Sequence, residues 1–99
     1  MAKQIIWSLL AQDDRKQILS YWNYRNKSTT YSKKLHQLFK DALTLVSQFA
    51  QIGRLTDEEN IRIKLVKEYL IVYEIDVNTI YVLKIWDGRR NPEKFNKLL

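Results

Sequence analysis

The chain contains no cysteine and a single histidine, His36. Without cysteine, disulfide bonds, thiol catalysis and cysteine-ligated zinc or iron–sulfur sites are excluded. No carboxylate stands at a catalytic spacing from His36, which is therefore expected on a helix surface rather than in a catalytic or metal site. We expect no cofactor and no metal, and the absence of thiols suits a reducing cytoplasm.

Long apolar runs, glycine and proline are also scarce. The longest apolar run is short, as in residues 69–73, whereas a membrane-spanning helix needs about 20 apolar residues. Residues 1–10 lack the features of a secretory signal. Two glycines and one proline among 99 residues argue against a disordered or collagen-like chain. We expect a soluble cytoplasmic protein with no membrane contact, folded as one domain over residues 1–99 with a mobile tail at 92–99.

Positive charge is in excess, with 17 Lys and Arg against 11 Asp and Glu, a net charge of +6. Such a charge favours an anionic partner such as nucleic acid, the ribosome or an acidic protein. It is equally compatible with a surface charged for solubility, because the cations are scattered along the chain. Charge alone leaves both readings open.

The first half predicts a strand followed by two helices. Residues 4–10 are rich in β-branched and aromatic side chains, which favours a strand. Apolar residues at helical spacing then predict a first helix from about residue 11 to Arg25, with Asp13 and Asp14 at its N-terminus. Ser, Thr and Thr at 28–30 cap a second helix over residues 31–49, for which Gly53 supplies a stop.

The second half predicts three consecutive antiparallel strands. Apolar runs at Ile61–Val66, Tyr69–Ile75 and 79–86 follow an acidic loop, and the gaps between them are too short for parallel crossovers. The predicted fold is α+β, in the order β-α-α-β-β-β. The two-helix hairpin covers one face of the sheet, and the first strand joins the three-stranded meander.

Two features of the predicted sheet call for a partner or a cover: a pair of cations on one strand, and a neighbouring strand that is apolar on both faces. Arg62 and Lys64 alternate with apolar residues and so share one face of their strand. The next strand is apolar on both faces, because Leu70 and Val72 oppose the residues that meet the helices. Two covers for that second face stay open: the chain's own tail, through Phe95, Leu98 and Leu99, or a segment of a partner protein.

Three segments carry a resemblance that spans nearly the whole chain. They are IIWSLLAQDDRKQILSYW at 5–22, IGRLTDEENIRIKLVKEYLIVYEI at 52–75 and IYVLKIWDGRRNPEKF at 80–95. In their order and spacing they resemble the RelE/ParE superfamily, the toxins of type II toxin–antitoxin (plasmid stabilisation) modules. The ending, Arg89-Arg90-Asn91-Pro92, is similar to the Arg-x-Asn-Pro signature of one subgroup.

The resemblance implies an antitoxin partner, a hetero-oligomer with it, and one of two activities. RelE-like members cleave mRNA on the ribosome without a metal, whereas ParE-like members inhibit DNA gyrase and cleave nothing. Lys64 and Arg89 match catalytic cations of the RNases, and Arg62 matches a second basic residue on the same strand. The arginine expected in the next strand falls on Leu70, and the C-terminal tyrosine falls on Phe95.

Leucine cannot stabilise an oxyanion and phenylalanine cannot transfer a proton, so a ParE-like gyrase inhibitor is favoured. The alternatives are a RelE-like mRNA endonuclease, with Lys64 and Arg89 catalytic, and a degenerate toxin that only binds its antitoxin. The candidate partner-binding residues are Arg62, Lys64, Leu70, Val72, Trp86, Arg89 and Arg90.

Overall fold

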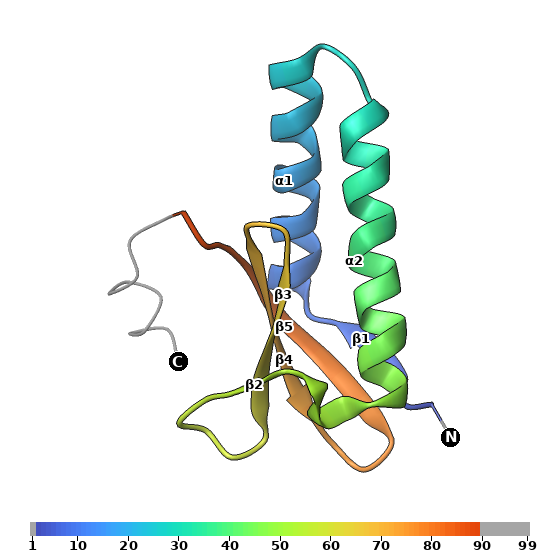
Figure 1. Ribbon diagram of the computed structural model, residues 1–99, viewed down its shortest axis with the longest axis vertical. Coiled ribbons are helices and arrows are strands. Elements are labelled where there is room, and N and C mark those ends of the chain that lie inside the picture. The colour runs from blue at the N-terminus through green and yellow to red at the C-terminus, as the bar shows by residue number, and fades with distance from the viewer. Residues whose placement is uncertain (1, 90–99) are drawn as a thin grey trace.

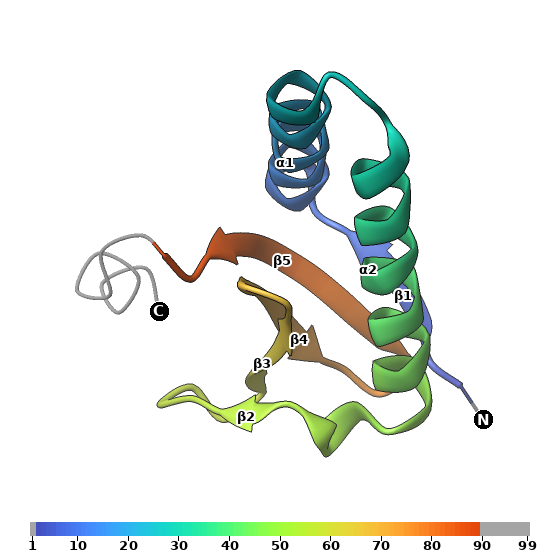
Figure 2. The same ribbon diagram turned by 45° about the horizontal axis from the view of Figure 1, so that its top comes forward.

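The computed structural model describes residues 2–89, which form one five-stranded sheet and two helices. The elements are β1 (Gln4–Trp7), α1 (Leu9–Asn26), α2 (Thr30–Gln48), the 3₁₀ turn η1 (Ala50–Ile52), β2 (Arg54–Leu55), β3 (Ile61–Val66), β4 (Tyr69–Ile75) and β5 (Thr79–Asp87). The α1–α2 hairpin rises beyond the end of the sheet (Figure 1), and both helices lie on the same side of β5 (Figure 2). The predicted α+β fold, with its helices on one face and its antiparallel meander, is confirmed.

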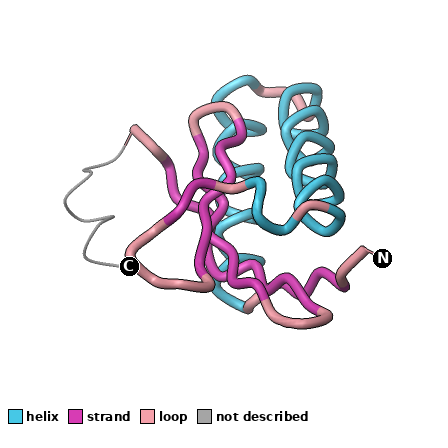
Figure 3. Tube along the Cα trace, turned by 60° about the horizontal axis from the view of Figure 1, so that its bottom comes forward, coloured by secondary structure: helices cyan, strands magenta, loops and turns pink. Residues whose placement is uncertain are grey.

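The strand order is β1-β5-β4-β3-β2. β1 runs parallel to β5, whereas every other neighbouring pair is antiparallel. The two helices lie side by side over these strands (Figure 3). β2 was not predicted, because its two residues carry no periodic signal and sit in a stretch that reads as an acidic loop.

The first strand is shorter than predicted, and α1 begins earlier. The Ser8 side chain accepts the Ala11 N–H at 3.0 Å and so caps a helix that already includes Leu9 and Leu10. Asp13 consequently lies past the first helical turn, which contains no acidic residue. The prediction that Asp13 and Asp14 mark the helix N-terminus is therefore wrong.

α2 confirms the periodic pattern, since Leu35, Phe39 and Val46 are fully buried along one of its faces. Phe39 meets Tyr69 of β4 edge to face, with 5.8 Å between ring centroids. Gly53 is not the stop that the sequence predicted. Its φ of −71° is not left-handed, and the helix is followed directly by the η1 turn.

Gly53 is needed instead for a close approach to Tyr73. A Cβ at Gly53 would stand 3.0 Å from the carbonyl oxygen of Ile63 and would overlap the Tyr73 hydroxyl. That hydroxyl accepts the Gly53 N–H at 3.0 Å and donates to the carbonyl of Ala50 at 2.7 Å. The fully buried Tyr73 thus holds the chain between α2 and β2 against the sheet.

Replacing Tyr73 by phenylalanine is expected to lower the free energy of unfolding by about 1–3 kcal/mol, because the buried Gly53 N–H loses its acceptor. Urea unfolding followed by circular dichroism measures the change. Tyr24, which is 87% exposed, provides the matched control, and its replacement by phenylalanine should change stability by less than about 0.5 kcal/mol. Equal stability of the two variants would contradict this role for Tyr73.

Within residues 2–89, neither helix is long and apolar enough to cross a membrane.

Candidate functional site

A cleft of about 360 Å³ lies between α1 and the edge of β5. It exists because β1 pairs with β5 only as far as Trp7 and Val82, so the rest of that edge faces α1. Side chains of α1, β4 and β5 line it, together with the residue that follows Gly88. They are Asp14, Gln17, Ile18, Tyr21, Tyr69, Lys84, Ile85, Trp86, Asp87 and Arg89.

Asp14 fastens α1 to this strand edge. Its Oδ2 accepts the backbone N–H of Ile85 at 3.0 Å and lies 3.4 Å from the ammonium of Lys84. A backbone donor at a sheet edge needs an acceptor when it is not paired to another strand. The Asp14 carboxylate supplies that acceptor. A side chain of α1 thus takes the N–H of β5 that a longer β1 would otherwise bind.

Arg89 lies at the mouth of the cleft, where its guanidinium is paired with carboxylates of the same chain. Its Nε and Nη2 donate to the two carboxylate oxygens of Asp87 at 3.0 and 2.8 Å, and Glu68 lies 4.0 Å from Nη1. The hydrogen bonds to Asp87 raise the pKa of the guanidinium above its ordinary value. The guanidinium also lies 5.7 Å from the Trp22 ring centroid. Arg89 is thereby held in one orientation while half of its side chain remains exposed.

Tyr69, the tyrosine at the base of the cleft, is not suited to proton abstraction. It is 2% exposed, and its hydroxyl accepts the Trp22 Nε1–H at 2.8 Å. Burial raises the pKa of Tyr69 above its ordinary value, and it does the same for Tyr73. Tyr69 and Tyr73 are therefore kept protonated, and neither is suited to act as the base.

The two cations of β3 lie on the helix side of the sheet. Arg62 pairs with Tyr73 and Lys64 with Ile71, and directly paired residues share a face. The Arg62 guanidinium donates to the carbonyls of Gln51 and Gly53 at 2.9 and 3.0 Å. The acceptors that Arg62 meets are therefore backbone oxygens of its own chain.

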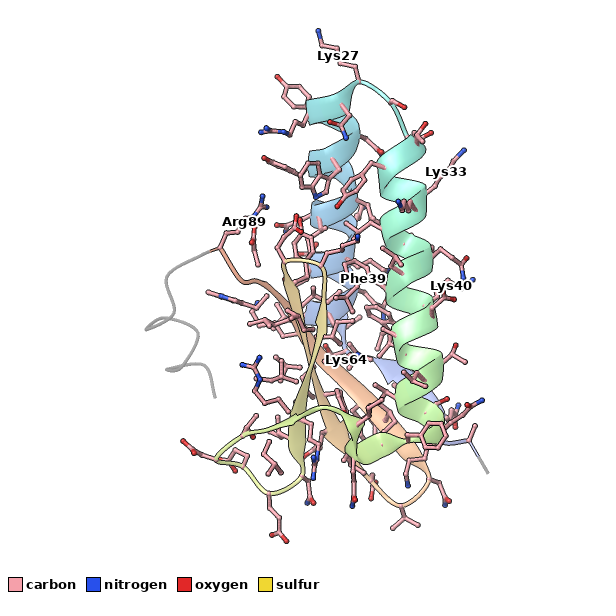
Figure 4. The ribbon with its side chains drawn as sticks, in the orientation of Figure 1. Lys27, Lys33, Phe39, Lys40, Lys64 and Arg89 are labelled. Atoms are coloured by element: carbon pink, nitrogen blue, oxygen red, sulfur yellow. The ribbon has the colours of Figure 1, made fainter. Side chains whose placement is uncertain are left out.

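The structure does not bring the predicted basic residues together. Trp86 and Arg89 line the cleft, whereas Arg62 and Lys64 are not part of its lining. Figure 4 shows Arg89 at the far end of β5, well above Lys64. Arg90, Phe95 and the rest of the predicted tail lie outside the described residues.

The sheet surface opposite the helices, here called the distal face, carries the apolar residues predicted for it. Ile63, Leu65, Leu70, Val72 and Trp86 form it through the pairs Ile63↔Val72, Leu65↔Leu70 and Leu70↔Trp86. Val72 is 4% exposed and Leu65 is 54% exposed. The prediction that β4 is apolar on both faces is confirmed.

Sequence reasoning missed several residues of the cleft, among them Asp14, Tyr21 and Asp87, and it also missed Glu68, which lies 4.0 Å from Arg89. Asp14 was assigned to a helix terminus, and nothing in its local sequence indicates a contact with a strand edge about 70 residues away. The spacing of Asp87 and Arg89 on either side of Gly88 was the one available signal for their ion pair, because the two side chains are separated by a single small residue.

A strand, a helical hairpin and a meander, with a cleft along the free edge of the last strand, make up a small α+β fold. A family model described as the ParE toxin of the type II toxin–antitoxin system, parDE, matches residues 5–92. The chain belongs to this family and is a type II toxin, so its partner is an antitoxin.

The fold also resembles a chain of the solved structure titled "Chromosomal ParDE TA system from P. aeruginosa". The TM-score is 0.73 at 16% identity, over 85% of this chain and 94% of that one. At this identity the likeness concerns the fold. No curated protein matches the chain.

Proposed function

We propose that this toxin inhibits DNA gyrase and cleaves no RNA. The observation that carries the proposal is the state of Arg89, which is bound in a bidentate pair to Asp87. Cleavage through the 2′-hydroxyl requires a base and a cation free to take up charge on the phosphate. Here the matching cation is neutralised by a neighbouring carboxylate, and Lys64 lies outside the cleft.

The position of Leu70 supports the same conclusion. RelE-like RNases are expected to carry an arginine there, and leucine offers no donor to an oxyanion. Leu70 instead pairs with Leu65 and Trp86 on the distal face. Its side chain therefore contributes apolar surface, which is useful for binding a protein and not for cleaving a phosphodiester.

One feature favours RelE-like cleavage as a second candidate. Tyr21 lines the same cleft as Arg89 and is 45% exposed, so its hydroxyl is accessible to a substrate. Arg25 donates to that hydroxyl at 3.3 Å. If this chain does cleave RNA, Tyr21 is the base that the structure offers in place of the missing C-terminal tyrosine.

The antitoxin is proposed to cover the distal face and to reach the mouth of the cleft. The half-exposed Leu65 and the partly buried Leu70 supply the accessible apolar contact, and Val72 and Trp86, 4% and 6% exposed, form the layer around them. Arg89, half of whose side chain stays exposed beside Asp87, would meet an acidic residue of the antitoxin at the end of β5, whereas Lys64 lies on the helix side of the sheet, away from the covered face. Arg62 contributes indirectly, by holding the turn that precedes β2.

Expression in a bacterial host is expected to arrest growth, and the purified toxin is expected to abolish gyrase supercoiling while abundant mRNAs stay intact in primer extension. Ribosome-dependent cuts with normal supercoiling would overturn the proposal. The Tyr21→Phe variant should then lose those cuts if Tyr21 is the base. A chain that binds its antitoxin but arrests nothing would be the degenerate toxin.

A further inference from the structure

The helical hairpin carries an uninterrupted stretch of positive charge. Residues 15–40 contain no Asp or Glu and seven Lys or Arg. Residues 49–89, which include strands β2 to β5, contain six Lys or Arg against seven Asp or Glu. The positive charge of the described chain is therefore concentrated on the hairpin. The seven cations are Arg15, Lys16, Arg25, Lys27, Lys33, Lys34 and Lys40.

These cations are solvent-facing and keep their charge uncompensated. All but Arg15 are exposed, and the ion pairs within residues 2–89 involve only Lys84 and Arg89. Arg15 and Arg25 lie over the rings of Trp7 and Trp22, at 4.2 and 5.9 Å. Residues 15–40 contain no carboxylate, and the three carboxylates of the same helices, Asp13, Asp14 and Asp41, lie outside this stretch, so its field is positive.

The same field acts on His36, which lies on α2. Burial lowers the pKa of His36, and the charges of Arg15 and Lys40 lower it further. The two cations come from different helices, so their fields overlap across the hairpin. A surface with this property attracts a partner that carries several negative charges in a row.

The cations are also placed where an extended partner can reach them. The tip of the hairpin rises beyond the end of the sheet (Figure 1), and Lys27, Lys33 and Lys40 point away from the strands (Figure 4). Lys33 and Lys40 are two helical turns apart, so they share a face of α2 with about 10 Å between them along the axis. Tyr24, 87% exposed, and the exposed hydroxyl residues at 28–30 stand close to Lys27 in the sequence, at the turn between the helices.

We propose that this cationic hairpin, residues 15–40, binds the phosphate backbone of duplex DNA. Lysines interspersed with hydroxyl groups suit phosphate contacts, which position a protein without reading sequence. Within residues 15–40 the exposed large hydrophobic side chains are Tyr21 and Tyr24, which offer an acidic protein segment no aliphatic anchor. The choice of duplex DNA as the source of phosphate rests on the proposed function, because gyrase acts on duplex DNA.

The test compares two double variants that lose equal charge from different places. Lys27→Gln with Lys33→Gln removes charge from the hairpin, and Arg54→Gln with Lys67→Gln removes it from the β2–β4 region. The pairs match closely, since each contains one exposed lysine with positive φ, 50° at Lys27 and 55° at Lys67. Binding of purified toxin to a short labelled duplex is measured by fluorescence anisotropy at several salt concentrations.

The hairpin variant is expected to weaken duplex binding by roughly tenfold or more and to flatten the slope of log K against log salt by about two, whereas the control variant changes neither. Equal weakening in both variants would show that only net charge matters and would overturn the proposal. Absence of duplex binding, or tighter binding to an RNA duplex of the same sequence, would overturn it as well. A gyrase assay run in parallel keeps the two questions separate, because duplex binding is measured without gyrase.

Discussion

Replacing Phe39 by alanine is expected to lower the free energy of unfolding by about 3–5 kcal/mol. Phe39 is fully buried where α2 crosses the sheet, and its ring packs edge to face on Tyr69. A domain of this size has about 5–15 kcal/mol of stability in total, so the variant would retain little of it. Urea unfolding gives the change directly, and growth arrest should weaken in proportion to the folded fraction.

Phe49 provides a control of the same residue type just beyond the end of the same helix. It is 60% exposed, so Phe49→Ala should cost less than about 1 kcal/mol. The comparison separates burial from the mere loss of a phenyl ring. A similar loss for both variants would mean that the core does not lie between α2 and β4.

Replacing Leu65 by glutamate is expected to weaken antitoxin binding by roughly 30- to 700-fold, or about 2–4 kcal/mol. Leu65 is 54% exposed on the distal face, so a carboxylate there is tolerated by the free toxin. Bound antitoxin would bury that carboxylate against apolar surface without a partner. Isothermal titration calorimetry with the cognate antitoxin measures the loss.

Leu55 offers the matched control, because it is 68% exposed on the neighbouring strand. It pairs with Arg62 and so faces the helix side, opposite to the distal face. Leu55→Glu should leave antitoxin affinity within about twofold of the unmodified toxin, a change of about 0.4 kcal/mol. If Leu55→Glu disrupts the complex and Leu65→Glu does not, the antitoxin lies on the other side of the sheet.

The sequence predicted the elements whose periodicity is strong. α2 has apolar residues at regular helical steps, and the three meander strands are separated by gaps that force antiparallel pairing. α1 was placed with less accurate bounds, because only Ala11 is fully buried on it and apolar residues occur all round it. Its start depends on one hydrogen bond from Ser8, which no periodic pattern reports.

The candidate site was predictable only in part. The two apolar faces of β4 follow from alternation within one strand. The partners of Arg62 and Arg89 do not, since they depend on a turn carbonyl and on the direction of side chains after β5. Strand alternation placed Arg62 and Lys64 together, but it could not tell which of the two faces the helices cover.

The parallel pairing of the first and last strands has a consequence during synthesis. Gln4 lies opposite Thr79, and Asp14 takes the N–H of Ile85, so both attachments wait for the final strand. A ribosome adds about 5–20 residues per second, which separates β1 from its partner by roughly 4–15 s. Until β5 emerges, β1 has no strand to pair with and the cleft beside α1 does not exist. A chain whose translation stops before β5 therefore lacks the cleft. An antitoxin already present in the cell can bind the toxin during the roughly 4–15 s between the synthesis of β1 and that of β5.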